Sequence, residues 1–174
     1  MAFGSPPRGR ERKEDSMETK LALYALTREE GQAVWFLNTL TLVKATGEQT
    51  GGAYGLVEQR IPAGFASPYH LHRAEDEAFY LLEGEATFIS GDRRIKATAG
   101  SYLFLPRDIP HGFKVEAPAR LLILTTPAGF EQFVIEMSEP ATDLTASPAS
   151  PPDMEKLMRL AAKYRIEILG PLPE

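Results

Sequence analysis

The sequence has no cysteine among its 174 residues, so disulfides, zinc–thiolate sites and thiolate nucleophiles are excluded. Long hydrophobic runs are also missing: no stretch approaches the roughly 20 apolar residues of a membrane-spanning helix or forms a signal peptide. Positive charge is not in excess, because the formal net charge is −5 with acids and bases interspersed. Nucleic acid and anionic membranes are therefore not expected partners, and we expect a cytoplasmic protein.

The length is that of one domain, large enough to bury a core without covalent cross-links. Residues 1–20 are polar, mixed in charge and rich in proline and glycine, which predicts a disordered N-terminal tail. Met17 is an alternative to Met1 as the natural start, and the sequence does not decide between them.

From Val34 onward, short apolar or alternating runs are separated by turn residues, a pattern typical of an all-β sandwich or barrel. We expect strands near Val34–Val43, Ala53–Ile61, Tyr69–Arg73, Glu77–Leu82, Ala86–Ser90, Arg93–Ala97, Ser101–Leu105, His111–Glu116 and Arg120–Thr126. The glycine-rich stretch 47–55 lacks the Lys-Ser/Thr of a phosphate-binding loop, so a plain loop or hairpin is expected there.

The pattern changes after Thr126. Residues 129–137 predict a short helix or turn that plugs one end of the fold. A Pro/Ser/Ala-rich linker, 140–152, precedes Asp153, which is a candidate N-cap for a helix. The ending at 166–169 is too apolar to be free, so it is expected to dock on its own chain or on a second subunit.

The three histidines are the chain's full complement, and all lie where one metal site would need them. His70 and His72 are one residue apart, so on a strand both imidazoles project from the same face. His111 follows a segment punctuated by glycine and proline, and it shares one face of its strand with Phe113 and Val115.

Glu77 follows His72 by five positions and falls on one face of its strand with Phe79 and Leu81. An unpaired carboxylate pointing inward would be costly, and a metal ion would remove that cost. The alternative interpretation is a surface acid within the run 75–77, in which Glu75 is the weaker substitute as a ligand.

Two blocks, Gly64 to Gly84 and Gly100 to His111, resemble the paired signature motifs of the cupin superfamily. The first block matches at every signature position. The second departs in two places: Asp108 stands where the family usually has glycine, and Lys114 or Val115 stands near its frequent asparagine. The resemblance implies a double-stranded β-helix (jelly-roll) barrel over residues 21–127 that binds one metal through His70, His72, Glu77 and His111, with a C-terminal helical extension over 128–174. A degenerate cupin with no metal is the alternative.

The C-terminal quarter is similar to that of the quercetinase-like cupins, on the segment Ala128–Phe133, the following proline-rich stretch and the apolar ending Tyr164–Ile168. Active members of that group open a flavonol ring with O2. This resemblance implies that the metal binds a deprotonated substrate hydroxyl and that Glu77 accepts its proton.

A set of three imidazoles and one carboxylate suits Fe, Mn, Ni, Cu or Zn, and no soft sulfur is present to select among them. Four protein ligands leave positions open to substrate, which is the arrangement of a reactive site. Glu77 is therefore the candidate catalytic residue as well as a ligand.

Eight aromatic residues are candidates for the substrate pocket, although filling a small core is an equally simple role for each. They are Tyr54, Phe79, Phe88, Tyr102, Phe104, Phe113, Phe130 and Phe133. No Arg or Lys cluster shares a face with the ligands in the motif strands, which favours an apolar or aromatic substrate over a phosphosugar.

Three classes of function remain open. The first is a metal-dependent dioxygenase acting on an aromatic or enolisable hydroxylated small molecule, with O2 as co-substrate. The second is a non-oxidative metal-dependent isomerase or lyase, and the third is a small-molecule-binding cupin without turnover. The apolar segments 21–26 and 166–169, which a lone barrel would leave partly exposed, predict a homodimer.

Overall fold

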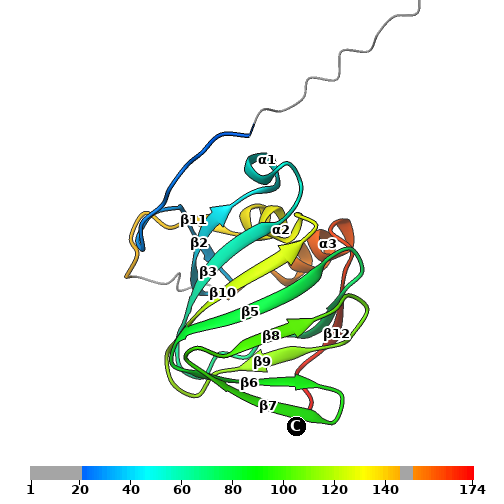
Figure 1. Cartoon of the computed structure of the whole chain (residues 1–174). Coiled ribbons are helices and arrows are strands. Elements are labelled where there is room, and N and C mark those ends of the chain that lie inside the picture. Colours follow the sequence, from blue (N-terminus) through cyan, green and yellow to red (C-terminus); the bar gives the residue numbers. More distant parts are fainter. Residues whose placement is uncertain (1–20, 146–150) are drawn as a thin grey trace, which may run out of the picture.

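The computed structural model describes residues 21–145 and 151–174, and its strands form jelly-roll sheets (Figure 1). The strands are β1 Gln32–Phe36, β2 Thr39–Ala45, β3 Gly55–Ile61, β4 Tyr69–His72, β5 Asp76–Glu83, β6 Glu85–Ser90, β7 Arg93–Thr98, β8 Tyr102–Leu105, β9 Gly112–Lys114, β10 Ala119–Thr126, β11 Glu139–Pro140 and β12 Ile166–Gly170. The helices are α1 Gly47–Thr50, α2 Phe130–Met137 and α3 Met154–Lys163. The expected all-β fold with a short helical arm is confirmed.

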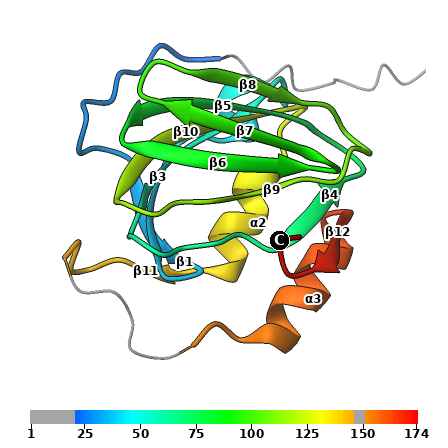
Figure 2. The same cartoon turned by 90° about the horizontal axis from the view of Figure 1, so that it is seen from below.

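Hydrogen bonds between the described strands form three antiparallel sheets, not one closed barrel. The largest has the order β11-β1-β2-β3-β10-β5-β8, the second is β7-β6-β9, and the third is β12-β4. Figure 2 shows β6 and β7 layered against the large sheet, with α2 between β1 and the β4–β12 pair. The inner surface of the sheets and α2 thus enclose one core.

Strand alternation builds this core as expected. Glu77, Phe79 and Leu81 of β5 are all buried, and β10 places Leu121 opposite Leu81 and Ile123 opposite Phe79. Each large apolar side chain buried in this way stabilises the fold by about 1.5–3 kcal/mol. Glu77 therefore points into the core, because it lies on the same face of β5 as Phe79 and Leu81.

The expectation of one strand over 34–43 is wrong, because the chain reverses direction within it. Leu37 and Asn38 have φ of 47° and 63° and join β1 to β2 as a two-residue hairpin. Positive φ at both central positions is the mark of a type I′ turn, which asparagine favours and leucine does not. The 47–55 stretch is likewise more ordered than a plain loop, because α1 forms one turn capped by Thr46.

Turns of the two motif blocks are left-handed where the family pattern requires it. Gly84 has φ of 78°, and a Cβ there would lie 2.5 Å from the carbonyl oxygen of Pro118. Asp108, which replaces the usual glycine, keeps φ of 65° and accepts a hydrogen bond of 2.9 Å from Arg73. Aspartate tolerates this conformation better than most residues, so the substitution leaves the turn intact.

The C-terminal arm, residues 153–170, docks on its own chain. The Asp153 side chain caps α3 by accepting from the backbone amide of Lys156 at 3.0 Å, as expected. Strand β12 then pairs with β4, placing Ile166 opposite His72 and Ile168 opposite His70. Among the described helices, none is long and apolar enough to cross a membrane. The expected tail 1–20 and part of the expected linker 140–152 lie outside the described residues.

A His/Glu cluster that opens into an apolar cavity

The side chains of His70, His72, Glu77 and His111 converge, and one ligand atom from each lies within 4.8 Å of the others. His70 and His72 come from β4, while Glu77 comes from β5. His111 faces His70 in an antiparallel bridge, with backbone hydrogen bonds of 2.9 and 2.8 Å in the two directions. The sheet pairing thus brings together residues separated by up to 41 positions in sequence.

Each imidazole is oriented by an acceptor at its Nδ1 atom. His70 Nδ1 lies 2.8 Å from the carbonyl oxygen of Pro68, and His111 Nδ1 lies 2.9 Å from that of Ile109. His72 Nδ1 is 3.4 Å from a carboxylate oxygen of the buried Glu75. Because a carbonyl oxygen only accepts, Nδ1 of His70 and of His111 carries the proton, and Nε2 of a neutral ring presents its lone pair.

The Nε2 atoms supply an observation that tests whether a metal fits. His72 Nε2 is buried without a hydrogen-bond partner among the described residues. His111 Nε2 lies 2.8 Å from Glu77 Oε2, so two acceptors face each other when the ring is neutral. A cation between these atoms satisfies all of them. Three imidazole nitrogens and one carboxylate oxygen could hold a divalent transition metal ion, and the set does not distinguish Fe, Mn, Ni, Cu and Zn.

The pKa values show how strongly the cluster is coupled. Burial alone would raise the pKa of Glu77, but His72 and His111 outweigh it and lower the pKa to about 2. Burial, together with the charge of His111, lowers the pKa of His70 to about 4. For His72, burial is outweighed by the carboxylates of Glu77 and Glu75, so its pKa is raised. At neutral pH Glu77 is therefore ionised and His70 is neutral.

Metal affinity is expected to fall as the pH drops through the range of the ordinary histidine pKa, about 6.5. A protonated imidazole has no lone pair for a metal, so protons compete with the ion. His72, whose pKa is raised, protonates before His70, which resists protonation until about pH 4. Equilibrium dialysis from pH 8 to pH 4, with metal content measured at each step, checks this expectation. Occupancy that stays flat over the whole range would contradict histidine ligation.

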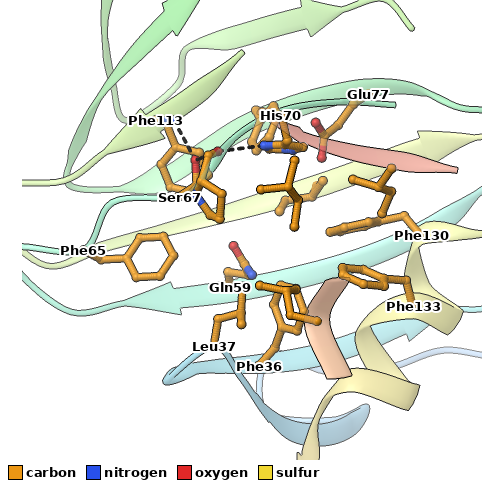
Figure 3. A pocket seen from close by; sticks show the side chains of 16 residues that line it. Phe36, Leu37, Gln59, Phe65, Ser67, His70, Glu77, Phe113, Phe130 and Phe133 are labelled. Atoms are coloured by element: carbon orange, nitrogen blue, oxygen red, sulfur yellow. Dashed lines mark hydrogen bonds between the residues drawn. The ribbon is translucent and has the colours of Figure 1, made fainter. Parts of the chain in front are cut away.

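A cavity of about 60 Å³ adjoins the cluster on the side of His70 and Glu77 (Figure 3). Its walls are mainly apolar and come from β1, β3, β5, β10, α2 and the C-terminal arm. The lining residues are Phe36, Leu37, Gln59, Phe65, Ser67, Pro68, His70, Glu77, Phe79, Phe113, Ile123, Phe130, Phe133, Leu157, Ile166 and Ile168. No Arg or Lys is among them.

Four of the eight aromatic residues predicted for the pocket, Phe79, Phe113, Phe130 and Phe133, line this cavity. Phe88 does not; it is buried behind the wall, with its ring centroid 4.9 Å from that of Phe79.

The expectation that Tyr54, Tyr102 and Phe104 point inward is wrong. Tyr102 and Phe104 are 64% and 54% exposed, because the inward row of β8 consists of Leu103 and Leu105. Tyr54 lies in the turn before β3 and is 39% exposed. The alternation of strand β8 has one apolar set on each face, so the pattern did not reveal which set is buried.

Sequence reasoning missed ten of the sixteen lining residues, among them Phe65, Ser67, Pro68 and Ile123. Two of the others, Phe36 and Leu37, belong to the hairpin that the sequence did not reveal. Three more belong to the C-terminal arm, for which the sequence did not decide between docking on its own chain and on a second subunit: Leu157, Ile166 and Ile168. Gln59 was also missed, although a signal existed: it interrupts the inward row Val57 and Ile61 of β3 with an amide.

Comparisons with known proteins agree with this architecture. The cupin domain family model matches residues 57–125. Quercetin 2,3-dioxygenase of Bacillus subtilis strain 168 is 25% identical over 118 residues, which cover 67% of this chain but only 35% of the relative.

Two solved structures share the fold. The polyketide cyclase RemF from Streptomyces resistomycificus matches with a TM-score of 0.53 at 21% identity, covering 60% of this chain and 80% of RemF. KdgF from a Halomonas species matches with a TM-score of 0.50 at 16% identity, covering 55% and 85%. The jelly-roll sheets, the family match over residues 57–125 and the His/Glu cluster together support a cupin-type domain in this chain.

Proposed function

We propose that this protein is a metal-dependent dioxygenase whose substrate is a small hydroxylated compound, aromatic or enolisable. The observation that carries the proposal is that a three-histidine, one-glutamate cluster opens, through His70 and Glu77, into an apolar cavity. The likeness to a quercetin 2,3-dioxygenase supports the same class of reaction. Because no Arg or Lys of the described residues lines the cavity, a phosphosugar or polycarboxylate substrate, as many isomerases and lyases use, is disfavoured.

In this proposal His70, His72, Glu77 and His111 hold the metal, which would supply Lewis acidity and, if redox-active, electron exchange with O2. Glu77 has a second role, since it lines the cavity and is ionised at neutral pH. Its carboxylate accepts the proton of the substrate hydroxyl, leaving an electron-rich oxyanion. Apolar side chains such as Phe79 and Phe130 hold the ring and exclude water from it.

Cavity size restricts the substrate. An apolar cavity of about 150 Å³ is known to accept benzene. The cavity of about 60 Å³ beside His70 is smaller, so a single-ring substrate requires some displacement of its walls, and a three-ring flavonol requires much more. We therefore propose a compact substrate, with the arm residues Leu157 and Ile168 forming part of the wall that limits its length.

Metal analysis followed by oxygen uptake tests the proposal. Purified protein is loaded separately with Fe(II), Mn(II), Ni(II), Cu(II) and Zn(II), and O2 consumption is recorded with single-ring hydroxyketones, catechols and flavonols. Consumption that depends on both metal and substrate supports a dioxygenase, and faster turnover of the single-ring compounds supports the compact substrate. A filled site that consumes no O2 with any of them would contradict the proposal and leave a non-oxidative enzyme or a binding protein.

We also propose that the protein is a symmetric homodimer that pairs through the outer face of β5 and β8. Tyr80 and Tyr102 are direct cross-strand neighbours there, and Phe104 lies two residues after Tyr102 on the same face of β8. All three are exposed, and the half-buried Leu122 and Leu124 of β10 extend the same apolar face. A contiguous exposed apolar face that spans three neighbouring strands is typical of a protein–protein interface.

Phe104→Glu is expected to convert the dimer to a monomer, because it places a charge in the proposed apolar interface. Light scattering during size-exclusion chromatography at micromolar concentration measures the mass. Ile95→Glu is the matched control, since Ile95 is an exposed apolar residue on β7, outside this face. A wild-type monomer, or a dimer unaffected by Phe104→Glu, would count against this interface.

A further inference from the structure

Gln59 is a buried amide in a wall that is otherwise mainly apolar. It is 3% exposed and lies on the inward face of β3, opposite Leu121 of β10 and Thr41 of β2. Figure 3 shows its amide pointing into the cavity from the side opposite His70 and Glu77. An aliphatic side chain of similar length would complete this wall without the cost of burying an amide.

The orientation of the amide follows from its neighbour Thr39. Thr39 Oγ1 donates to the carbonyl oxygen of Phe36 at 2.6 Å, so it has only acceptor capacity left for other groups. Gln59 Nε2 lies 3.5 Å from this hydroxyl and is the donor of the pair. The amide oxygen of Gln59 is then the atom directed away from Thr39, toward the cavity.

No hydrogen bond to that oxygen is found among the described residues, and it is not one of their fully buried unpaired atoms, so it is accessible from the cavity. The other polar group in the wall remote from the cluster is Ser67, which donates to the carbonyl of Pro68 at 3.1 Å and accepts from the amide of Phe113 at 3.0 Å. Ser67 is therefore satisfied, and Gln59 alone of the two offers an open acceptor. A ligand that donates a hydrogen bond to this oxygen would pair it.

We infer that Gln59 is a specificity-determining residue that accepts a hydrogen bond from a hydroxyl at the end of the substrate remote from His70 and Glu77. The inference rests on the proposed function and narrows its substrate class. The ligand is a compact ring with two polar ends: an ionisable hydroxyl beside Glu77 and a second hydrogen-bond donor beside Gln59. Between these ends the ring contacts only apolar groups, as the walls require.

Kojic acid and allomaltol form a matched pair of probes for this arrangement. Both carry the same enolic hydroxyl beside a ring ketone, and they differ by one hydroxyl on the substituent at the opposite end of the ring. Calorimetry on the metal-loaded wild-type protein should show that kojic acid binds roughly fivefold or more tightly than allomaltol, the effect of about one hydrogen bond. Gln59→Leu should abolish or reverse this preference, whereas Val57→Ala, a change at a buried residue of the same strand that does not line the cavity, should keep it.

The outcomes separate this inference from the proposed function. Equal binding of the two probes by the wild-type protein, or a preference that survives in Gln59→Leu, overturns the role of Gln59 while leaving the proposed function in place. A variant that loses thermal stability yet keeps the preference shows that Gln59 only supports the β1–β2 hairpin through Thr39, and this also overturns the inference. If neither probe binds the wild-type protein, the role of Gln59 is overturned, and the oxygen-uptake panel decides the proposed function separately.

Discussion

Replacing His111 by alanine is expected to reduce the affinity for metal by more than about 100-fold, beyond the usual effect of losing an outer-shell partner. Two interactions are lost together: the metal-binding lone pair of Nε2, which lies 2.8 Å from Glu77 Oε2, and the Nδ1 hydrogen bond that orients the ring. The carboxylate of Glu77 then remains buried with one fewer partner, which further disfavours the site. Metal analysis after dialysis against a weak chelator, together with a titration of metal-free protein, measures the change.

Phe113→Leu is the matched control, because Phe113 is buried on the same strand segment but carries no ligand atom. It should lower the free energy of unfolding while keeping the bound metal. His72→Ala provides an independent test from β4, since its unpartnered Nε2 belongs to the same cluster. Near-stoichiometric metal retained by both histidine variants would remove the assignment of these residues as ligands.

Glu77→Gln is expected to lower the activity per bound metal by roughly two orders of magnitude or more, the usual contribution of a general base. Glutamine keeps the size and one possible ligand oxygen, but it cannot accept the proton of a substrate hydroxyl. If Glu77 acted only as a ligand, activity would fall in proportion to the metal lost. Turnover must therefore be divided by measured metal content, on whichever substrate proves active.

Glu75→Gln is the control for that variant. Glu75 is also a buried carboxylate and contacts His72 Nδ1 at 3.4 Å, yet it does not line the cavity. Its substitution should weaken metal binding moderately by loosening the orientation of His72, while activity per metal is retained. Full activity per metal in Glu77→Gln would restrict Glu77 to coordination.

The resemblance to the cupin motifs implied which side chains converge in the cluster, and strand alternation accounts for the shared faces of His70, His72 and Glu77. The same logic located Phe79 and Phe113 in the cavity wall. Alternation failed at β8, where Leu103 and Phe104 are both apolar and only the neighbouring layers decide which is buried. When both faces of a strand carry apolar residues, the sequence pattern does not indicate which face is buried.

Other features depended on tertiary pairing that a linear pattern does not contain. The hairpin at Leu37 was hidden because leucine is rare at positive φ, and Asn38 was its only local signal. The docking of β12 on β4 joins residues far apart in sequence, so apolar character predicted burial but not the partner. Gln59 shows that a polar residue on the predicted buried face of a strand is as good a candidate for the site as the histidines.

The pairing of β12 with β4 makes the C-terminal arm part of the scaffold of the cluster. Among the described strands, β4 has one ladder partner, and that partner aligns Ile166 and Ile168 with His72 and His70. Local opening of the arm would expose an edge of the histidine strand and loosen two ligands at once. Because such coupling is reciprocal, an ion bound by the cluster would in turn protect the arm against proteolysis and hydrogen exchange. Metal loading and docking of the last strand would then behave as one cooperative equilibrium.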